Sequence, residues 1–315
     1  MPLGIGVGSI RALLKELESP SAGSSRLAVG GARELAGVLR REFERDAAPG
    51  AVAGDERLEG ATALVYVLGR EPGDEDEQML RRASRAGVPV VAVVVGPLGE
   101  DVSLPYVLAT DVVRVGAGEG FPVETIAAAL AARLGEAGAP LAARVPVLRR
   151  PVCDALIASF ARKNGLVAAA VFVRKAGSVG GGAADARPKY GGADRPLLTL
   201  NQLRLVLRIA QAHGEQVGRD RLPELAAVVG SGVGLRSLAR ELLDLVPPAA
   251  DDVGRGLSAG RRRLGRRRFQ RIAGWAVKGA VAYAGTRALG EAAVRRFEAG
   301  VGEERRSSPA TPPRA

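Results

Sequence analysis

The sequence is poor in the residues that build most metal and redox sites. Its 315 residues include one cysteine, Cys153, and one histidine, His213. A single thiol cannot form an intramolecular disulfide or a thiolate cage for a metal, and one imidazole excludes any site that needs two. The composition therefore excludes zinc fingers, histidine-rich metallohydrolases and disulfide-stapled secreted folds. We expect neither a bound cofactor nor a metal, and no catalytic residue.

Aromatic residues and long apolar runs are also scarce. Aromatics make up 3% of the chain although 47% is hydrophobic, so the cores must consist mainly of Ala, Val and Leu. No uncharged apolar run is long enough for a standard spanning helix; the longest candidates are 165–173 and the interrupted stretch 272–294. The N-terminus has no basic segment before an apolar stretch and no convincing cleavage site, which predicts a cytoplasmic origin.

Acidic residues are absent from the most basic part of the chain. The formal charge is +11, from 45 basic and 34 acidic residues. Residues 255–290 contain nine Arg and Lys278 but no Asp or Glu, so this segment carries nearly the whole excess. Basic density of this kind attracts polyanions, either an anionic membrane leaflet or nucleic acid.

The first half of the chain alternates between strand and helix patterns. Apolar runs of strand length lie at 27–29, 63–68, 88–95 and 112–115, and helical patterns lie at 32–45, 74–86 and 123–134. Continuous apolar strands separated by helices predict a parallel sheet covered on both faces. We therefore predict a small α/β domain over 26–140, preceded by an amphipathic helix and linker over 1–25.

Beyond residue 140 the pattern predicts an all-α helical domain over 146–300. Prolines separate predicted helices at 151–175, 194–213, 220–246 and 262–299. The glycine-rich segment 177–192 predicts a loop, and the charged, Ser/Pro-rich segment 301–315 predicts a disordered tail.

The α/β pattern raises the question of nucleotide binding. A phosphate loop needs glycines followed by Lys-Ser/Thr after the first strand, but no such pair follows Gly30 and Gly31. The acidic run 74–77 is the candidate source of a magnesium carboxylate, and no Asn-Lys-x-Asp for a guanine base follows Val95. We expect no nucleotide hydrolysis. The alternative is a residual GTP-binding protein or GTPase that uses Gly30, Gly31 and the acidic run.

The order of these elements resembles a small GTPase domain that has lost its nucleotide-contacting residues. Residues 64–68, 72–82 and 87–93 resemble the stretch between the metal-binding strand and the base-recognition strand of bacterial GTPases. The segment Val115-Gly-Ala-Gly-Glu-Gly-Phe-Pro-Val-Glu resembles the last loop of that fold, which leads into a closing helix. The resemblance implies a degenerate GTPase-like domain.

The second half is similar to the helical, GTPase-associated family called "domain of unknown function 697". The similarity rests on Asp194-Arg-Pro-Leu-Leu-Thr-Leu-Asn-Gln202, on 208–214, on 234–242 with Val246-Pro247, and on 288–300, in the expected order. Members of this family commonly lie beside or behind GTPase domains in bacteria and are linked to the inner membrane. The resemblance implies a non-catalytic scaffold at the cytoplasmic face of that membrane, peripheral or partly inserted, with an active GTPase as a candidate partner.

The last predicted helix suits a membrane without reference to any family. Small residues recur every four positions, which favours close helix packing: Ala276, Ala280, Ala284 and Ala288. The expected contacts with anionic lipid are Arg261, Arg262, Arg263, Arg266, Arg267, Arg268, Arg271 and Trp275. Two alternatives remain: a soluble bundle helix after a solvated basic linker, and a nucleic-acid-binding module that uses the arginine block 261–271.

Other polar residues favour structural roles. A Leu-rich helix carries a polar ridge, and such groups must pair internally, so the ridge predicts a helix–helix lock. Its residues are Asp194, Thr199, Asn201 and Gln202. His213 precedes a helix-ending glycine, which favours a helix cap over a catalytic base. Cys153 is expected to be a buried structural thiol.

Overall fold

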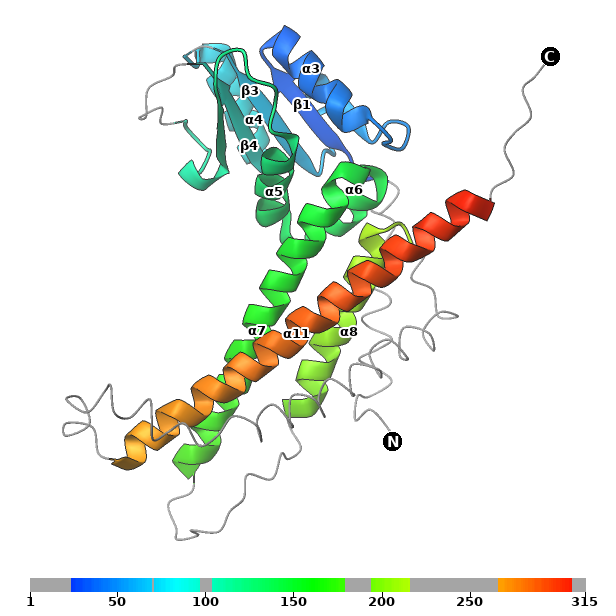
Figure 1. The fold of residues 1–315 in the computed structure, drawn as a ribbon. Helices are drawn as coiled ribbons and strands as arrows, with labels where there is room; N and C mark the ends of the chain where they lie inside the picture. Colours follow the sequence, from blue (N-terminus) through cyan, green and yellow to red (C-terminus); the bar gives the residue numbers. More distant parts are fainter. Residues whose placement is uncertain (1–23, 70, 97–103, 179–193, 216–265, 308–315) are drawn as a thin grey trace. The chain divides into compact units, whose positions relative to one another are not determined.

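The computed structural model describes residues 24–69, 71–96, 104–178, 194–215 and 266–307 (Figure 1). The chain divides into two compact units. Within the described residues, one unit comprises 24–156 and 208–215 and is called the α/β unit below. The other comprises 157–207 and 266–307 and is called the helical unit.

The α/β unit is built on a five-stranded parallel sheet with the order β2-β1-β3-β4-β5. The strands are β1 (Leu27–Gly31), β2 (Val52–Gly54), β3 (Ala63–Leu68), β4 (Val90–Val95) and β5 (Val112–Val115). Every residue of β3 is buried, which explains why the strands are apolar throughout rather than alternating. The α/β class and the parallel sheet are confirmed. Strand β2 was not expected, because three residues that end in glycine give no strand signal.

Four helices accompany the sheet: α3 (Arg33–Glu44), α4 (Asp74–Arg85), α5 (Val123–Leu134) and α6 (Gly138–Arg144). Leu80 and Ala83 of α4 belong to one core cluster together with Leu64, Tyr66 and Leu68 of β3. The alternate residues of β3 point to the opposite face, which α3 and α5 cover with Leu39, Phe43, Ile126 and Leu130.

The α/β unit extends further than the sequence pattern indicated. Leu141 and Leu148 are fully buried, and the Arg144 guanidinium donates hydrogen bonds to the carbonyls of Ser25 (2.8 Å) and Pro49 (2.9 Å). The Ala48 amide donates to the Arg144 carbonyl at 2.7 Å. The segment after residue 140 is therefore bound to the α/β unit, although its composition already resembles that of the helical half.

Three long helices form the described part of the helical half: α7 (Arg149–Ser178), α8 (Asp194–Ala212) and α11 (Arg266–Ser307). The first residues of α7 and the last of α8 belong to the α/β unit. α11 continues through Ser307, into the segment expected to be a tail, because no proline interrupts the helix before Pro309.

Several expectations fall outside the described residues. They are the N-terminal helix as far as residue 23, the glycine-rich loop from 179 to 192, the helix at 220–246 and the tail from 308 to 315. α7 includes the first residues of the expected loop, up to Ser178.

Candidate functional site

The topology indicates where a ligand would bind in the α/β unit. In an open parallel sheet, ligands bind outside the carboxyl ends of the strands, where the strand order reverses direction. In this sheet the chain moves from β1 outward to β2 and then returns past β1 to β3. The reversal therefore lies between the carboxyl ends of β1 and β3. β1 ends in Gly30 and Gly31, which together with Ala32 are called the loop after β1 below, and Gly69 follows β3.

The loop after β1 uses its amides within the chain. The Gly31 amide donates to Asp55 Oδ2 at 3.3 Å, and the Ala32 amide donates to the Val67 carbonyl at 2.8 Å. A phosphate-binding loop must instead point such amides at its ligand. Here the carboxylate of Asp55, the residue that follows β2, accepts the hydrogen bond that a bound phosphate would otherwise accept from the Gly31 amide.

The glycine pair is explained by these same contacts. A Cβ on Gly30 would collide with the Asp55 carboxylate, and a Cβ on Gly31 would collide with the Val67 carbonyl. Gly31 also has a φ of 100°, which favours glycine. The two glycines therefore allow a close approach within the sheet. Sequence reasoning missed Asp55 because it did not expect β2, the strand that places this carboxylate beside Gly31.

The acidic run at 74–77 has a structural function. Asp76 is buried; its Oδ1 accepts a hydrogen bond from the Tyr66 hydroxyl at 2.9 Å, and its Oδ2 accepts one from the Gly73 amide at 2.9 Å. The carboxylate thus caps the first turn of α4 and satisfies a buried phenol. Among the described residues, no group of three or more His, Cys, Asp or Glu side chains could hold a metal ion.

The single cysteine and the single histidine meet inside the α/β unit. Cys153 Sγ lies 3.9 Å from His213 Nε2, and both residues are buried. Burial, and secondly the nearby Arg149 cation, lowers the pKa of His213 from 6.5 to about 4, so the imidazole is neutral at pH 7. His213 directly follows the last residue of α8, and Gly214, with a φ of 84°, turns the chain after it. A thiol fully shielded from solvent is not positioned to attack a substrate.

A chain of hydrogen bonds crosses the helical unit. Asn164 of α7 is fully buried; its Nδ2 donates to Thr286 Oγ1 of α11 at 2.9 Å, and its Oδ1 accepts from Asn201 Nδ2 of α8 at 2.8 Å. Thr286 Oγ1 donates onward to the Ala282 carbonyl at 2.8 Å. One side chain therefore joins three helices, and the predicted polar ridge supplies Asn201 to this network.

Glycines allow α7 and α11 to approach closely. A Cβ on Gly165 would lie 3.1 Å from the Gly279 carbonyl oxygen, and a Cβ on Gly279 would lie 3.1 Å from the Gly165 carbonyl oxygen. Further along, a Cβ on Gly290 would collide with the Ile157 side chain. Small residues at a helix crossing let backbones pack closely, both in membrane bundles and in soluble ones.

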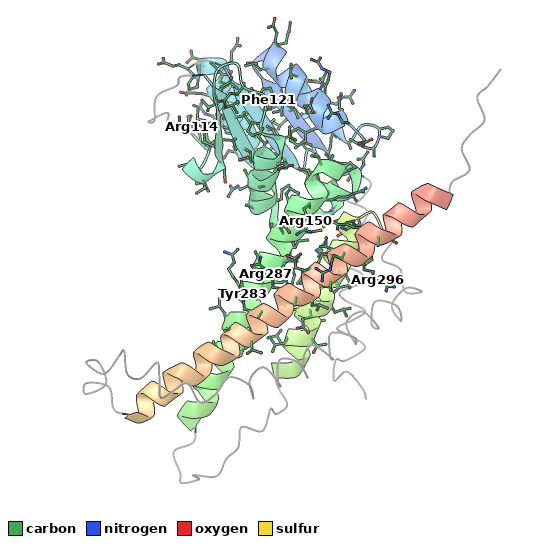
Figure 2. The ribbon with its side chains drawn as sticks, viewed as in Figure 1. Arg114, Phe121, Arg150, Tyr283, Arg287 and Arg296 are labelled. Atoms are coloured by element: carbon green, nitrogen blue, oxygen red, sulfur yellow. The ribbon has the colours of Figure 1, made fainter. Side chains whose placement is uncertain are left out.

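The alanine stripe of α11 does not form this contact. Ala280, Ala284 and Ala288 are exposed, because Gly279, Thr286 and Gly290 provide the packed face instead. These three alanines therefore do not pack against α7 or α8, and their packing against another helix stays a prediction. Side chains such as Arg287 and Arg296 project from α11 on its exposed surface (Figure 2).

The remaining predicted contact residues are only partly described. Asp194 is the first residue of α8, and Gln202 is half-buried on that helix. The structure describes the backbone but not the side chains at the start of α11, where Arg266, Arg267, Arg268, Arg271, Trp275 and Ala276 lie. Arg261, Arg262 and Arg263 lie outside the described residues.

One helical stretch in the described part of the chain has the length and apolar composition of a membrane span, namely Val123–Arg144. This stretch contains α5 and α6, and half of it is buried in the α/β unit, where Ile126 and Leu130 help to form the core. These properties are those of a core helix.

Comparison with protein-family models, curated proteins and solved structures finds no match to this chain.

Proposed function

We propose that this protein is a non-catalytic, membrane-associated scaffold. In this proposal the α/β unit is a GTPase-like fold that does not hydrolyse nucleotide, and the helical unit contacts anionic lipid at the cytoplasmic face of the bacterial inner membrane. An active GTPase is a candidate partner.

The observation that carries the non-catalytic part is the internal use of the loop after β1. The Gly31 amide is bound to the Asp55 carboxylate, and the Ala32 amide is bound to the Val67 carbonyl. A bound phosphate would have to displace one internal partner and would lie beside a carboxylate of like charge. The Lys-Ser/Thr pair that a phosphate loop requires is also absent after these glycines. The parallel α/β sheet is compatible with a GTPase-like fold at the level of fold class, while its order β2-β1-β3-β4-β5 is that of flavodoxin-like doubly wound sheets.

The helical unit supports the membrane part through its distribution of charge. Three helical stretches contain no charged residue: 164–170 of α7, 197–203 of α8 and 279–286 of α11. Hydrogen bonds between Asn164, Asn201 and Thr286 bring these stretches together. Within them Leu166 is 72% exposed and Leu197 is 47% exposed. Exposed apolar side chains in an uncharged region, next to the basic start of α11, suit the interface of an anionic bilayer.

Calorimetric titration with GTP and magnesium tests the non-catalytic part. We expect no binding heat from the full chain, because the loop amides are already paired. Binding at micromolar concentration would overturn this part of the proposal and favour the residual GTPase. The variant Asp55→Ala serves as a comparison, since it removes the carboxylate that competes with phosphate while leaving Gly30 and Gly31 in place.

Co-sedimentation with vesicles tests the membrane part. We expect the full chain to pellet with phosphatidylglycerol-containing vesicles at low salt and to be released when Arg266, Arg267 and Arg268 are replaced by Ser. A matched control removes three exposed arginines further along α11: Arg287, Arg295 and Arg296. Equal release by both variants would indicate nonspecific attraction, and recovery of the wild type in the supernatant would refute membrane association. A shift of DNA in a gel at low salt, without vesicle binding, would favour the nucleic-acid alternative.

A further inference from the structure

A tight turn in the α/β unit contains an unusual residue. In the segment Leu104-Pro105-Tyr106-Val107 the Val107 amide donates to the Leu104 carbonyl at 3.3 Å, and Tyr106 has a φ of 69°. Proline at the second position and a positive φ at the third are the pattern of a type II turn. The third position of such a turn is normally glycine, because a side chain there is strained.

Among the residues that the structure describes, no contact of Tyr106 requires a tyrosine at this position. Leu104 is buried and Val107 packs against the same core, so these two residues hold the turn in place. Tyr106 itself is 53% exposed. The guanidinium carbon of Arg81 lies 5.9 Å from the centroid of the Tyr106 ring, near the outer limit of a cation–π interaction. A strained residue without evident structural gain is a mark of function.

The surroundings of Tyr106 have the composition of a protein-binding surface. Leu108, two residues further on, is 56% exposed. Arg81 and Arg85 are exposed on successive turns of α4, whereas Arg82 between them pairs with Glu59. Tyrosine and arginine are the residues most enriched in binding hot spots. We call Arg81, Arg85, Tyr106 and Leu108 the Tyr106 patch.

We propose that the Tyr106 patch is the docking surface for a partner protein that offers an apolar pocket with carboxylates on its rim. Tyr106 inserts as the anchor, Leu108 extends the apolar contact, and Arg81 and Arg85 pair with the carboxylates. This inference rests on the proposed scaffold function and adds the surface that the partner binds. A rigid, strained anchor suits a shaped protein pocket, because a fluid lipid surface does not require a fixed side-chain direction.

The first test measures the strain and needs no partner. Tyr106→Gly and Tyr106→Ala both remove the side chain, but only glycine relieves the positive φ. We expect the Gly variant to melt above the Ala variant by roughly 2–4 °C and no lower than the wild type. A Gly variant that melts clearly below the wild type would show that the fold requires the tyrosine, which would overturn the proposal.

The second test identifies the occupant. Benzoylphenylalanine replaces Tyr106 in the full chain, with the same substitution at Val38, which is 42% exposed on α3, as a control. After irradiation in the native host, we expect an adduct at position 106 and not at position 38. The purified partner should bind the Tyr106→Gly and Arg81→Glu variants at least tenfold more weakly than the wild type, and more weakly as salt increases.

Three results would overturn the proposal. They are the absence of an adduct specific to position 106, an adduct with a second copy of this chain, and a partner whose affinity Tyr106→Gly leaves unchanged. Vesicle sedimentation separates this inference from the membrane proposal, because we expect Tyr106→Gly to pellet as the wild type does. Loss of vesicle binding in that variant would assign the patch to lipid instead and refute the protein pocket.

Discussion

The buried imidazole of His213 should make the α/β unit sensitive to acid. Burial and the Arg149 cation lower its folded-state pKa from 6.5 to about 4. At pH values between about 4 and 6.5, the unfolded chain binds a proton at His213 and the folded chain does not. The contribution of neutral His213 to stability is therefore complete above pH 6.5 and is lost as the pH falls toward 4. At pH 5 the free energy of unfolding should be lower than at pH 8 by about 2 kcal/mol from this one residue. Replacement by glutamine, which does not titrate, should remove this component.

The thiol of Cys153 provides the assay, because it is the sole cysteine, is fully buried and lies beside His213. Its rate of reaction with dithiodipyridine, divided by the rate in denatured protein at the same pH, reports the opening of this site. Between pH 8 and pH 5 we expect the normalised rate to increase about 30-fold more in the wild type than in His213→Gln. If the two proteins respond to pH in parallel, the imidazole is not the group that titrates, and the reasoning is refuted.

Two further substitutions test the polar contacts of each unit. Asp76→Ala should lower the free energy of unfolding of the α/β unit by about 2–3 kcal/mol, because it removes the hydrogen bonds that the Tyr66 hydroxyl and the Gly73 amide donate to the carboxylate. Asp76→Asn should lose less, and urea unfolding at pH 7 measures both. Asn164→Leu should destabilise the helical unit by about 2 kcal/mol, because the buried Thr286 hydroxyl loses a donor and the half-buried Asn201 amide loses its acceptor. Thermal unfolding followed by circular dichroism checks this, and an unchanged melting temperature would contradict the network.

The regular part of the fold was predictable because its signals are local. The apolar run at 63–68 has the length and composition of a buried strand, and β3 occupies those residues. The acidic start of the helix at 74–86 complements the helix dipole, and α4 begins at Asp74. Cys153 is buried as expected, but the expectation rested on the lack of a recognisable histidine partner in the sequence, and the structure places His213 3.9 Å from the thiol.

The contacts that decide the sites were not predictable, because they depend on distant neighbours. Asp55 has an effect on the loop after β1 only because β2 pairs with β1. The alanine repeat of α11 predicted a packed face, yet glycines and a threonine on another face make the contact. The dipeptide Pro105-Tyr106 gives no sign that the tyrosine adopts a positive φ.

The sequence by itself determined the α/β class, the helices of the described second half and the concentration of positive charge before and within the last helix. These properties follow from composition and periodicity, which each segment carries independently of the others. Only the tertiary structure decided that Asp55 pairs with the loop after β1, that Asn164 joins three helices and that Tyr106 projects from a strained turn. Pairing and strain depend on which atoms lie close together in the folded chain, and the separation of residues along the sequence does not specify this.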